Sequence, residues 1–156
     1  MIKNRKDVLF FGIIFFIIDQ SLKLIVSKNI ILDSGFEIIK DVLNIHLVYN
    51  TGAAFSILSG NRLLLIAISV LALIFFIVFL FNQNNVKDLE VFTYSMLLGG
   101  ILGNLFDRIF RGYVIDFISF KIFGYSFPIF NFADICIVLS LIILIIENLK
   151  GDLWKE

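Results

Sequence analysis

Two aspartates in the C-terminal half of the sequence have the residue type and the setting for acid–base chemistry. Asp116 lies in the segment GYVIDFISF, and Asp134 lies in FNFAD at the start of an apolar run. Neither acid has an obvious cationic neighbour in the sequence. Two carboxyl groups that meet in a partly apolar site cannot both ionise at low cost, so they share one proton. One group then acts as a base for water and the other as an acid for a carbonyl, which is the chemistry of aspartic peptide hydrolysis.

A structural role for Asp134 fits the same residues. Pro128 precedes the apolar run, Asn131 has the residue type of a helix N-cap, and Asp134 follows it at the spacing of a capping box. Capping gives no account of Asp116. If the preceding helix ends near Arg111 and the chain doubles back, the two acids lie at the same depth and could meet. Both explanations of Asp134 therefore stay open at the level of the sequence.

The elements that must position these acids belong to a membrane protein. Of the 156 residues, 60% are apolar, 15% are aromatic and only one is proline, which is far from the composition of a soluble domain. We expect one mainly α-helical domain over residues 1–156, and the net charge of zero gives no indication of nucleic-acid binding. Four apolar segments predict membrane-spanning helices, at about residues 8–26, 63–81, 91–109 and 130–147.

The density of lysine and arginine orients these helices. With both termini and the loop 82–90 on one side, that side carries six such residues in roughly 24, against five in roughly 56 on the other. We therefore expect both termini in the cytoplasm and the longer connections, 27–62 and 110–128, outside. The N-terminal MIKNRK and its apolar run share features with a secretory signal peptide, but no small-residue cleavage site follows, so we expect this helix to be retained.

The first outer connection predicts a small β structure. It mixes β-branched and aromatic residues with glycine, and the segment ILDSG before it is typical of a turn. We expect a strand platform at about residues 36–60, and a short amphipathic segment around Asp116 in the second outer connection. The single histidine, His46, cannot form a metal site alone, so the sequence predicts no metal.

Further polar residues gather at the outer ends of the predicted helices. Asp19 and Lys23 have the i, i+4 spacing of an ion pair, which could support the fold or only reach toward the membrane interface. In GGILGNLFDR, glycines at small-xxx-small spacing predict a close approach of two helices. Asn104, Asp107 and Arg108 lie in the same segment. An arginine beside the acid would neutralise it, which favours a structural cluster over catalysis.

Five short blocks, in order along the chain, resemble the lipoprotein signal peptidase family, also called signal peptidase II. The blocks are DQSLK, NTGAAF, GNLFDR, VIDF and FNFAD. The resemblance covers nearly the whole chain, with four helices and both termini inside. It implies an integral aspartic endopeptidase of the bacterial cytoplasmic membrane. Such an enzyme removes the signal peptide from prolipoproteins just before a cysteine that carries diacylglycerol.

The resemblance also implies roles for individual residues. Asp116 and Asp134 would be the catalytic pair, near the outer face of the membrane. The residues that shape the site and hold substrate would be Asn50, Gly52, Asn104, Arg108 and Asn131, and those that support the fold would be Asp19, Lys23 and Asp107. The strand platform would be the family's β-cradle, and the antibiotic globomycin would be an inhibitor. The implied partners are the prolipoprotein and membrane lipid, and no metal or organic cofactor is implied.

Two other classes of function use some of the same features. A small proton-coupled transporter or channel component would also carry acids within the membrane, but near the midplane rather than at one surface. A structural membrane protein would need no second carboxylate such as Asp116.

Overall fold

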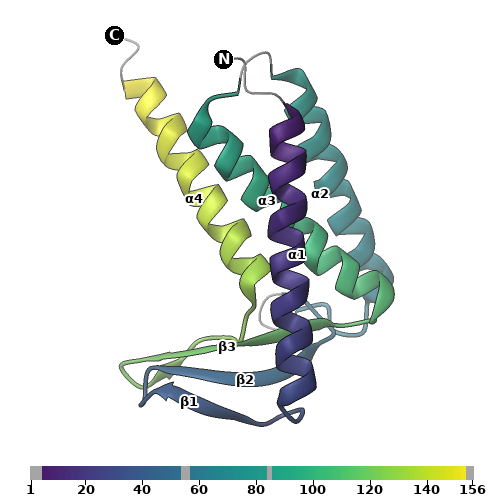
Figure 1. The fold of residues 1–156 in the computed structure, drawn as a ribbon, viewed down its shortest axis with the longest axis vertical. Coiled ribbons are helices and arrows are strands. Elements are labelled where there is room, and N and C mark those ends of the chain that lie inside the picture. The colour runs from purple at the N-terminus through teal and green to yellow at the C-terminus, as the bar shows by residue number, and fades with distance from the viewer. Residues whose placement is uncertain (1–4, 54–56, 84–85, 154–156) are drawn as a thin grey trace.

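The structure, a computed structural model, describes residues 5–53, 57–83 and 86–153 of the chain. Four long helices form a bundle, and a small β-sheet lies across one end of it (Figure 1). α1 begins and α4 ends at the opposite end of the bundle (Figure 1). The helices are α1 (Arg5–Asn29), α2 (Arg62–Asn82), α3 (Asp88–Phe110) and α4 (Phe132–Leu153).

All four helices are long and apolar enough to cross a membrane. In a bilayer core the backbone must satisfy its own hydrogen bonds, which a helix does within one segment. Large apolar side chains such as Phe10, Leu63 and Ile145 are exposed on the outside of the bundle, where lipid would surround them. The predicted mainly α-helical membrane fold, with four long apolar helices and a small sheet, is confirmed.

α3 is the central helix of the bundle and packs against the other three. Two of its glycines allow α1 to approach closely. A Cβ atom at Gly99 would lie 2.4 Å from the Cβ of Phe15, and one at Gly103 would lie 2.4 Å from Oδ2 of Asp19. The small-xxx-small pattern of α3 therefore brings the polar turns of α1 and α3 into contact.

The sheet differs in extent from the platform expected at residues 36–60. It contains four antiparallel strands in chain order, and the strands of the first outer connection end at Asn50. The segment around Asp116, expected as a short amphipathic segment, is a strand that pairs with β2 and places Asp116 opposite Val48. The strands are β1 (Gly35–Ile39), β2 (Leu43–Asn50), β3 (Val114–Ile122) and β4 (Tyr125–Ser126).

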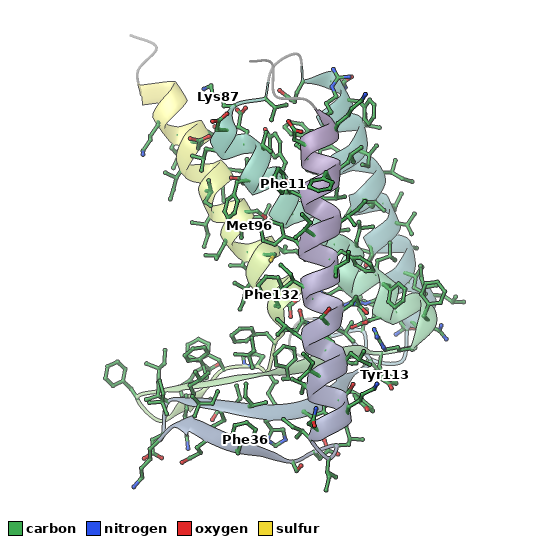
Figure 2. The ribbon with its side chains drawn as sticks, viewed as in Figure 1. Phe11, Phe36, Lys87, Met96, Tyr113 and Phe132 are labelled. Atoms are coloured by element: carbon green, nitrogen blue, oxygen red, sulfur yellow. The ribbon has the colours of Figure 1, made fainter. Side chains whose placement is uncertain are left out.

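The end of α3, the strand β3 and the start of α4 meet at the sheet end of the bundle. Tyr113, between α3 and β3, and Phe132, in the first turn of α4, both lie near this end, whereas Lys87 lies at the opposite end (Figure 2). Polar residues that lie far apart in the sequence are thereby brought to one level of the bundle.

Candidate active site

Asp134 lies in the first turn of α4, and the capping box predicted from the sequence is present. The side-chain oxygen of Asn131 accepts a hydrogen bond from the Asp134 backbone N–H at 3.0 Å, and the Asp134 carboxylate accepts one from the Asn131 N–H at 3.1 Å. The side-chain amide of Asn104 also donates to this carboxylate, at 2.8 Å. A helix N-terminus stabilises negative charge, so the position suits a carboxylate. The capping bonds leave part of the Asp134 carboxylate accessible, because the side chain is only half-buried and lines a cavity.

Asp116 lies on β3 and is almost fully buried, with 3% of its surface exposed. Its carboxylate accepts hydrogen bonds from the side-chain amide of Asn131 at 2.7 Å and from that of Asn50 at 2.9 Å. Asn131 thus contacts both acids, Asp116 through its side chain and Asp134 through its backbone N–H and side-chain oxygen. The structure brings the two aspartates into one site.

Neighbouring donors fix the orientation of the two asparagine amides between the acids. Lys23 can only donate, and its Nζ lies 3.0 Å from Oδ1 of Asn104, so the NH2 group of Asn104 faces Asp134. The oxygen of Asn131 accepts the Asp134 N–H, which leaves the NH2 group of Asn131 for Asp116. Both amides therefore present donors to the carboxylates.

The loop after β2 orients Asn50 in the same way. The Gly52 N–H donates to Oδ1 of Asn50 at 2.8 Å, and the NH2 group of Asn50 is left to donate to Asp116. Gly52 is itself buried. Each of the predicted site-shaping asparagines thus holds a carboxylate through an NH2 group whose direction another group has fixed.

Both aspartates line one cavity of about 540 Å³. Its other walls come from α3, α4, the segment 127–130, the start of β3 and, at Asn50 and Ala53, the end of β2 and the loop after it. Burial, and then the nearby charge of Asp134, raise the pKa of Asp116 to about 6, although the hydrogen bonds from Asn50 and Asn131 act in the opposite direction. Asp116 therefore keeps its proton to a higher pH than an ordinary aspartate. A carboxyl group that keeps its proton beside a second carboxylate can supply both an acid and a base.

A cluster of buried charges lies behind the two aspartates, between α1 and α3. Nζ of Lys23 lies 2.9 Å from carboxylate oxygens of both Asp19 and Asp107, and all three side chains are buried. Arg111 is the second cation of Asp107, and Gln20 donates to both carboxylates. The idea that Asp19 and Lys23 reach toward the membrane interface is therefore wrong, because helix packing encloses them.

Arg108 does not neutralise Asp107, contrary to the expectation from the sequence. Adjacent helix residues point in different directions, so Asp107 meets Lys23 while Arg108 lines the cavity. The guanidinium makes only 3.4 Å contacts, to the carbonyl oxygens of Asn104 and Gly52. Within the described ranges no carboxylate forms an ion pair with it, and its buried Nε has no hydrogen-bond partner. A cation with unused donors at a cavity wall is suited to hold a ligand.

Arg111 is the residue of this region that the sequence interpretation missed. It pairs with Asp107 and donates a hydrogen bond of 2.7 Å to the side chain of Gln20. The signal was available, because Asp107 and Arg111 are four residues apart and residues at that spacing share a helix face. The adjacent Arg108 was the less suitable partner on the same geometric grounds.

Relatives identified by sequence share most of the length of this chain. Residues 11–150 match the family described as signal peptidase (SPase) II. Lipoprotein signal peptidases from two strains of Staphylococcus aureus, bovine RF122 / ET3-1 and Newman, are each 39% identical to the chain over 140 residues. Each alignment covers 90% of this chain and 86% of the relative.

Two solved structures have the same fold as this chain. A bacterial membrane enzyme solved by the in meso method at 2.3 Å is 35% identical and has a TM-score of 0.89, covering 97% of this chain and 93% of its own. Another, solved by the same method at 1.9 Å, is 36% identical and has a TM-score of 0.83, covering 96% and 98%. The resemblance inferred from the five sequence blocks is thus confirmed, and the chain belongs to the signal peptidase II family of multi-pass membrane peptidases.

Proposed function

We propose that this peptidase cleaves prolipoproteins immediately before a cysteine that carries diacylglycerol, with Asp116 and Asp134 as its acid and base. One observation carries the proposal: Asn131 contacts both carboxylates, and both face one largely apolar cavity. The acids come from different elements, β3 and α4, so their meeting is a property of the fold rather than of local sequence.

The cavities suit a substrate with two apolar parts. A second cavity, of about 640 Å³, lies along α2, α3 and α4, and its largely apolar lining includes Asp134. One cavity would hold the apolar segment of the signal peptide, and the other would hold the acyl chains. Both parts of the substrate would arrive from membrane lipid. The two cavities share Ala53, Asn104, Arg108, Asp134 and Ile137.

The proposed chemistry assigns one role to each aspartate. Asp134 takes a proton from water as the water oxygen bonds to the scissile carbonyl carbon, and Asp116 gives its proton to the carbonyl oxygen. The proton on Asp134 then passes to the amide nitrogen as the C–N bond breaks. A hydroxyl proton of the tetrahedral intermediate returns to Asp116, which restores the starting state. The raised pKa of Asp116 supports its assignment as the first acid.

Arg108 would hold a carbonyl group of the substrate near the two aspartates. We therefore predict that Arg108→Leu raises KM by about tenfold or more, the loss expected for one charge-assisted hydrogen bond. The melting temperature should stay at the parental value or rise, because no described carboxylate forms an ion pair with this guanidinium and a buried unpaired Nε is removed. Steady-state kinetics and melting in detergent measure the two effects.

The matched control for Arg108 is Arg62→Leu, which removes another arginine from the same end of the bundle. Arg62 donates to the carbonyl oxygens of Arg108 and Ile109 and lines neither of the two apolar cavities. It should leave KM near the parental value. A large drop in the melting temperature of Arg108→Leu with an unchanged KM would instead assign Arg108 a structural role.

The membrane setting follows from the same assignment. We place the protein in the bacterial cytoplasmic membrane with both termini inside and the sheet outside, because the substrate's lipidated cysteine lies near the outer surface. In a Cys136→Ser background, a single cysteine at Lys40 should react with a membrane-impermeant thiol reagent on intact cells. A cysteine at Lys87 should not react, although both positions are exposed in the fold. Labelling at position 87 alone would reverse the orientation.

The proposed activity is tested with purified protein and two forms of one prolipoprotein, with and without diacylglycerol on the cysteine. The lipidated form should be cleaved, mass spectrometry should find the new N-terminus at the modified cysteine, and globomycin should inhibit the reaction. Equal cleavage of both forms, or cleavage at another bond, would contradict the proposed specificity.

A further inference from the structure

Lys23 is a buried hub that no solvent reaches. Its ammonium group donates to carboxylate oxygens of Asp19 and Asp107, each at 2.9 Å, and to Oδ1 of Asn104 at 3.0 Å. Its three N–H donors therefore match three acceptors, one of which is the asparagine that holds Asp134. Lys23 is therefore connected to the proposed active site through Asn104, and its contacts extend beyond the interface of α1 and α3.

The two acids bound to Lys23 each hold the backbone beside one of the proposed catalytic aspartates. Oδ1 of Asp19 accepts the N–H of Ala133, the residue before Asp134, at 3.0 Å. Oδ2 of Asp107 accepts the N–H of Ile115, the residue before Asp116, at 3.2 Å. One ion cluster thus contacts both of the segments, β3 and α4, that carry the acids.

We infer that Lys23, Asp19 and Asp107 form a positioning unit that sets the separation of Asp116 and Asp134. The inference rests on the proposed two-aspartate function. Backbone hydrogen bonds of Phe130 with Phe117 and Ile118 already join β3 to the segment before α4. The shared anchor on α1 and α3 adds a second link, at the residues that directly precede the two acids. A displacement of about 1 Å at reacting groups can lower a rate about 10²-fold.

Stability alone is a weak reason for these three charges to be buried. Replacing a buried ion cluster by apolar residues of similar volume is often neutral or stabilising, because the charges lose their hydration. The inference rests instead on what the two carboxylates bind. Asp19 and Asp107 each accept a hydrogen bond from the backbone N–H of the residue that precedes a cavity-lining aspartate.

Gly103 offers a test that removes no charge. A Cβ atom there would lie 2.4 Å from Oδ2 of Asp19 and 3.3 Å from the Cβ of Ala133, so Gly103→Ala must displace the Asp19 carboxylate or α4. Gly12→Ala is the matched control in the same α1–α3 interface. The three atoms nearest to its Cβ atom would all belong to the side chain of Leu98, at 2.7 to 3.2 Å, and not to a residue of the ion cluster.

We expect Gly103→Ala to lower kcat by about 10- to 100-fold, with KM changed by less than about twofold and a melting temperature close to that of Gly12→Ala. The pH profile of kcat should also shift, because the distance between two interacting carboxyl groups changes their titration. A merely structural role would leave kcat and the pH profile of the folded enzyme unchanged, and that result would overturn the inference.

Asp19→Asn and Asp107→Asn test the two arms of the unit separately. Asp19 uses Oδ2 for Lys23 and Oδ1 for the Ala133 N–H, and the single oxygen of an amide cannot serve both. Asp107 uses Oδ2 for both Lys23 and the Ile115 N–H, so an amide that keeps this oxygen turns its NH2 group toward Arg111 and Gln20, which are both donors. Each folded variant should show the same loss of kcat with little change in KM, and parental kcat in both would contradict the unit. If either variant fails to fold, Gly103→Ala alone decides.

A failure of the positioning unit can be distinguished from a failure of the proposed two-aspartate mechanism. If Asp116→Asn and Asp134→Asn remain active, the two-aspartate mechanism fails whatever Gly103→Ala does. If those two are inactive while Gly103→Ala has the kcat and pH profile of Gly12→Ala, only the positioning unit fails.

Discussion

Replacing either Asp116 or Asp134 by asparagine is expected to reduce prolipoprotein cleavage by about 10³-fold or more, because each change removes a group that must gain or lose a proton. Asparagine keeps the size of the side chain, so both variants should still fold in detergent. The rate of appearance of the lipidated product, measured by mass spectrometry, gives the effect. Melting of the same samples shows whether the loss reflects chemistry.

Asp41→Asn is the matched control for these two variants. Asp41 lies in the exposed turn between β1 and β2 with a φ angle of 58°, a conformation that asparagine also adopts readily. Cleavage by this variant should equal that of the parent. Because the capping box is present, Asp134→Asn should also lose a few tenths to about 1 kcal/mol of helix-terminus stabilisation. An active Asp134→Asn variant with a lowered melting temperature would leave this acid as a cap only.

Asn131→Ser is expected to lower cleavage by about 10²-fold while it preserves the start of α4. A serine hydroxyl caps a helix about as well as an asparagine side chain and can accept the Asp134 N–H. It is too short to replace the 2.7 Å bond from Asn131 to Asp116. Kinetics and melting should therefore separate, with a reduced rate and a melting temperature near that of the parent.

Asn131→Ala completes the comparison, because alanine provides neither the cap nor the bridge. Its rate should match that of Asn131→Ser, and its stability should be lower by about 1 kcal/mol, the typical loss when a cap is removed. Parental cleavage by Asn131→Ser would show that the contact between Asn131 and Asp116 has no part in the reaction.

The helices could be predicted from the sequence because their signal is local. An uncharged apolar run such as 63–81 has few alternatives to a helix in a bilayer, and α2 occupies Arg62–Asn82. The capping box is local as well, because it could be predicted from the residue types of Asn131 and Asp134 and their separation of three positions. The catalytic role of Asp134 is not visible at that scale and stays a prediction.

Contacts between distant segments could not be predicted in the same way. Asn50 donates to Asp116 across 66 residues of sequence, because β3 joins the strands of the first outer connection. No periodicity within GYVIDFISF shows which strand it will pair with. The contacts of Lys23 with Asn104 and Asp107 likewise depend on the close approach of α1 and α3 at Gly103.

The most direct test of the two-aspartate account is the titration of Asp116 with and without the charge of Asp134. In the parent, the carboxyl signal of Asp116, assigned by its loss in Asp116→Asn, should titrate near pH 6 in infrared or ¹³C spectra. In Asp134→Asn its pKa should fall, because one of the two causes that raise it is gone, but burial should keep it above the ordinary value of 3.8. An unchanged titration of Asp116 in Asp134→Asn would show that the two carboxyl groups do not interact, and would contradict the account.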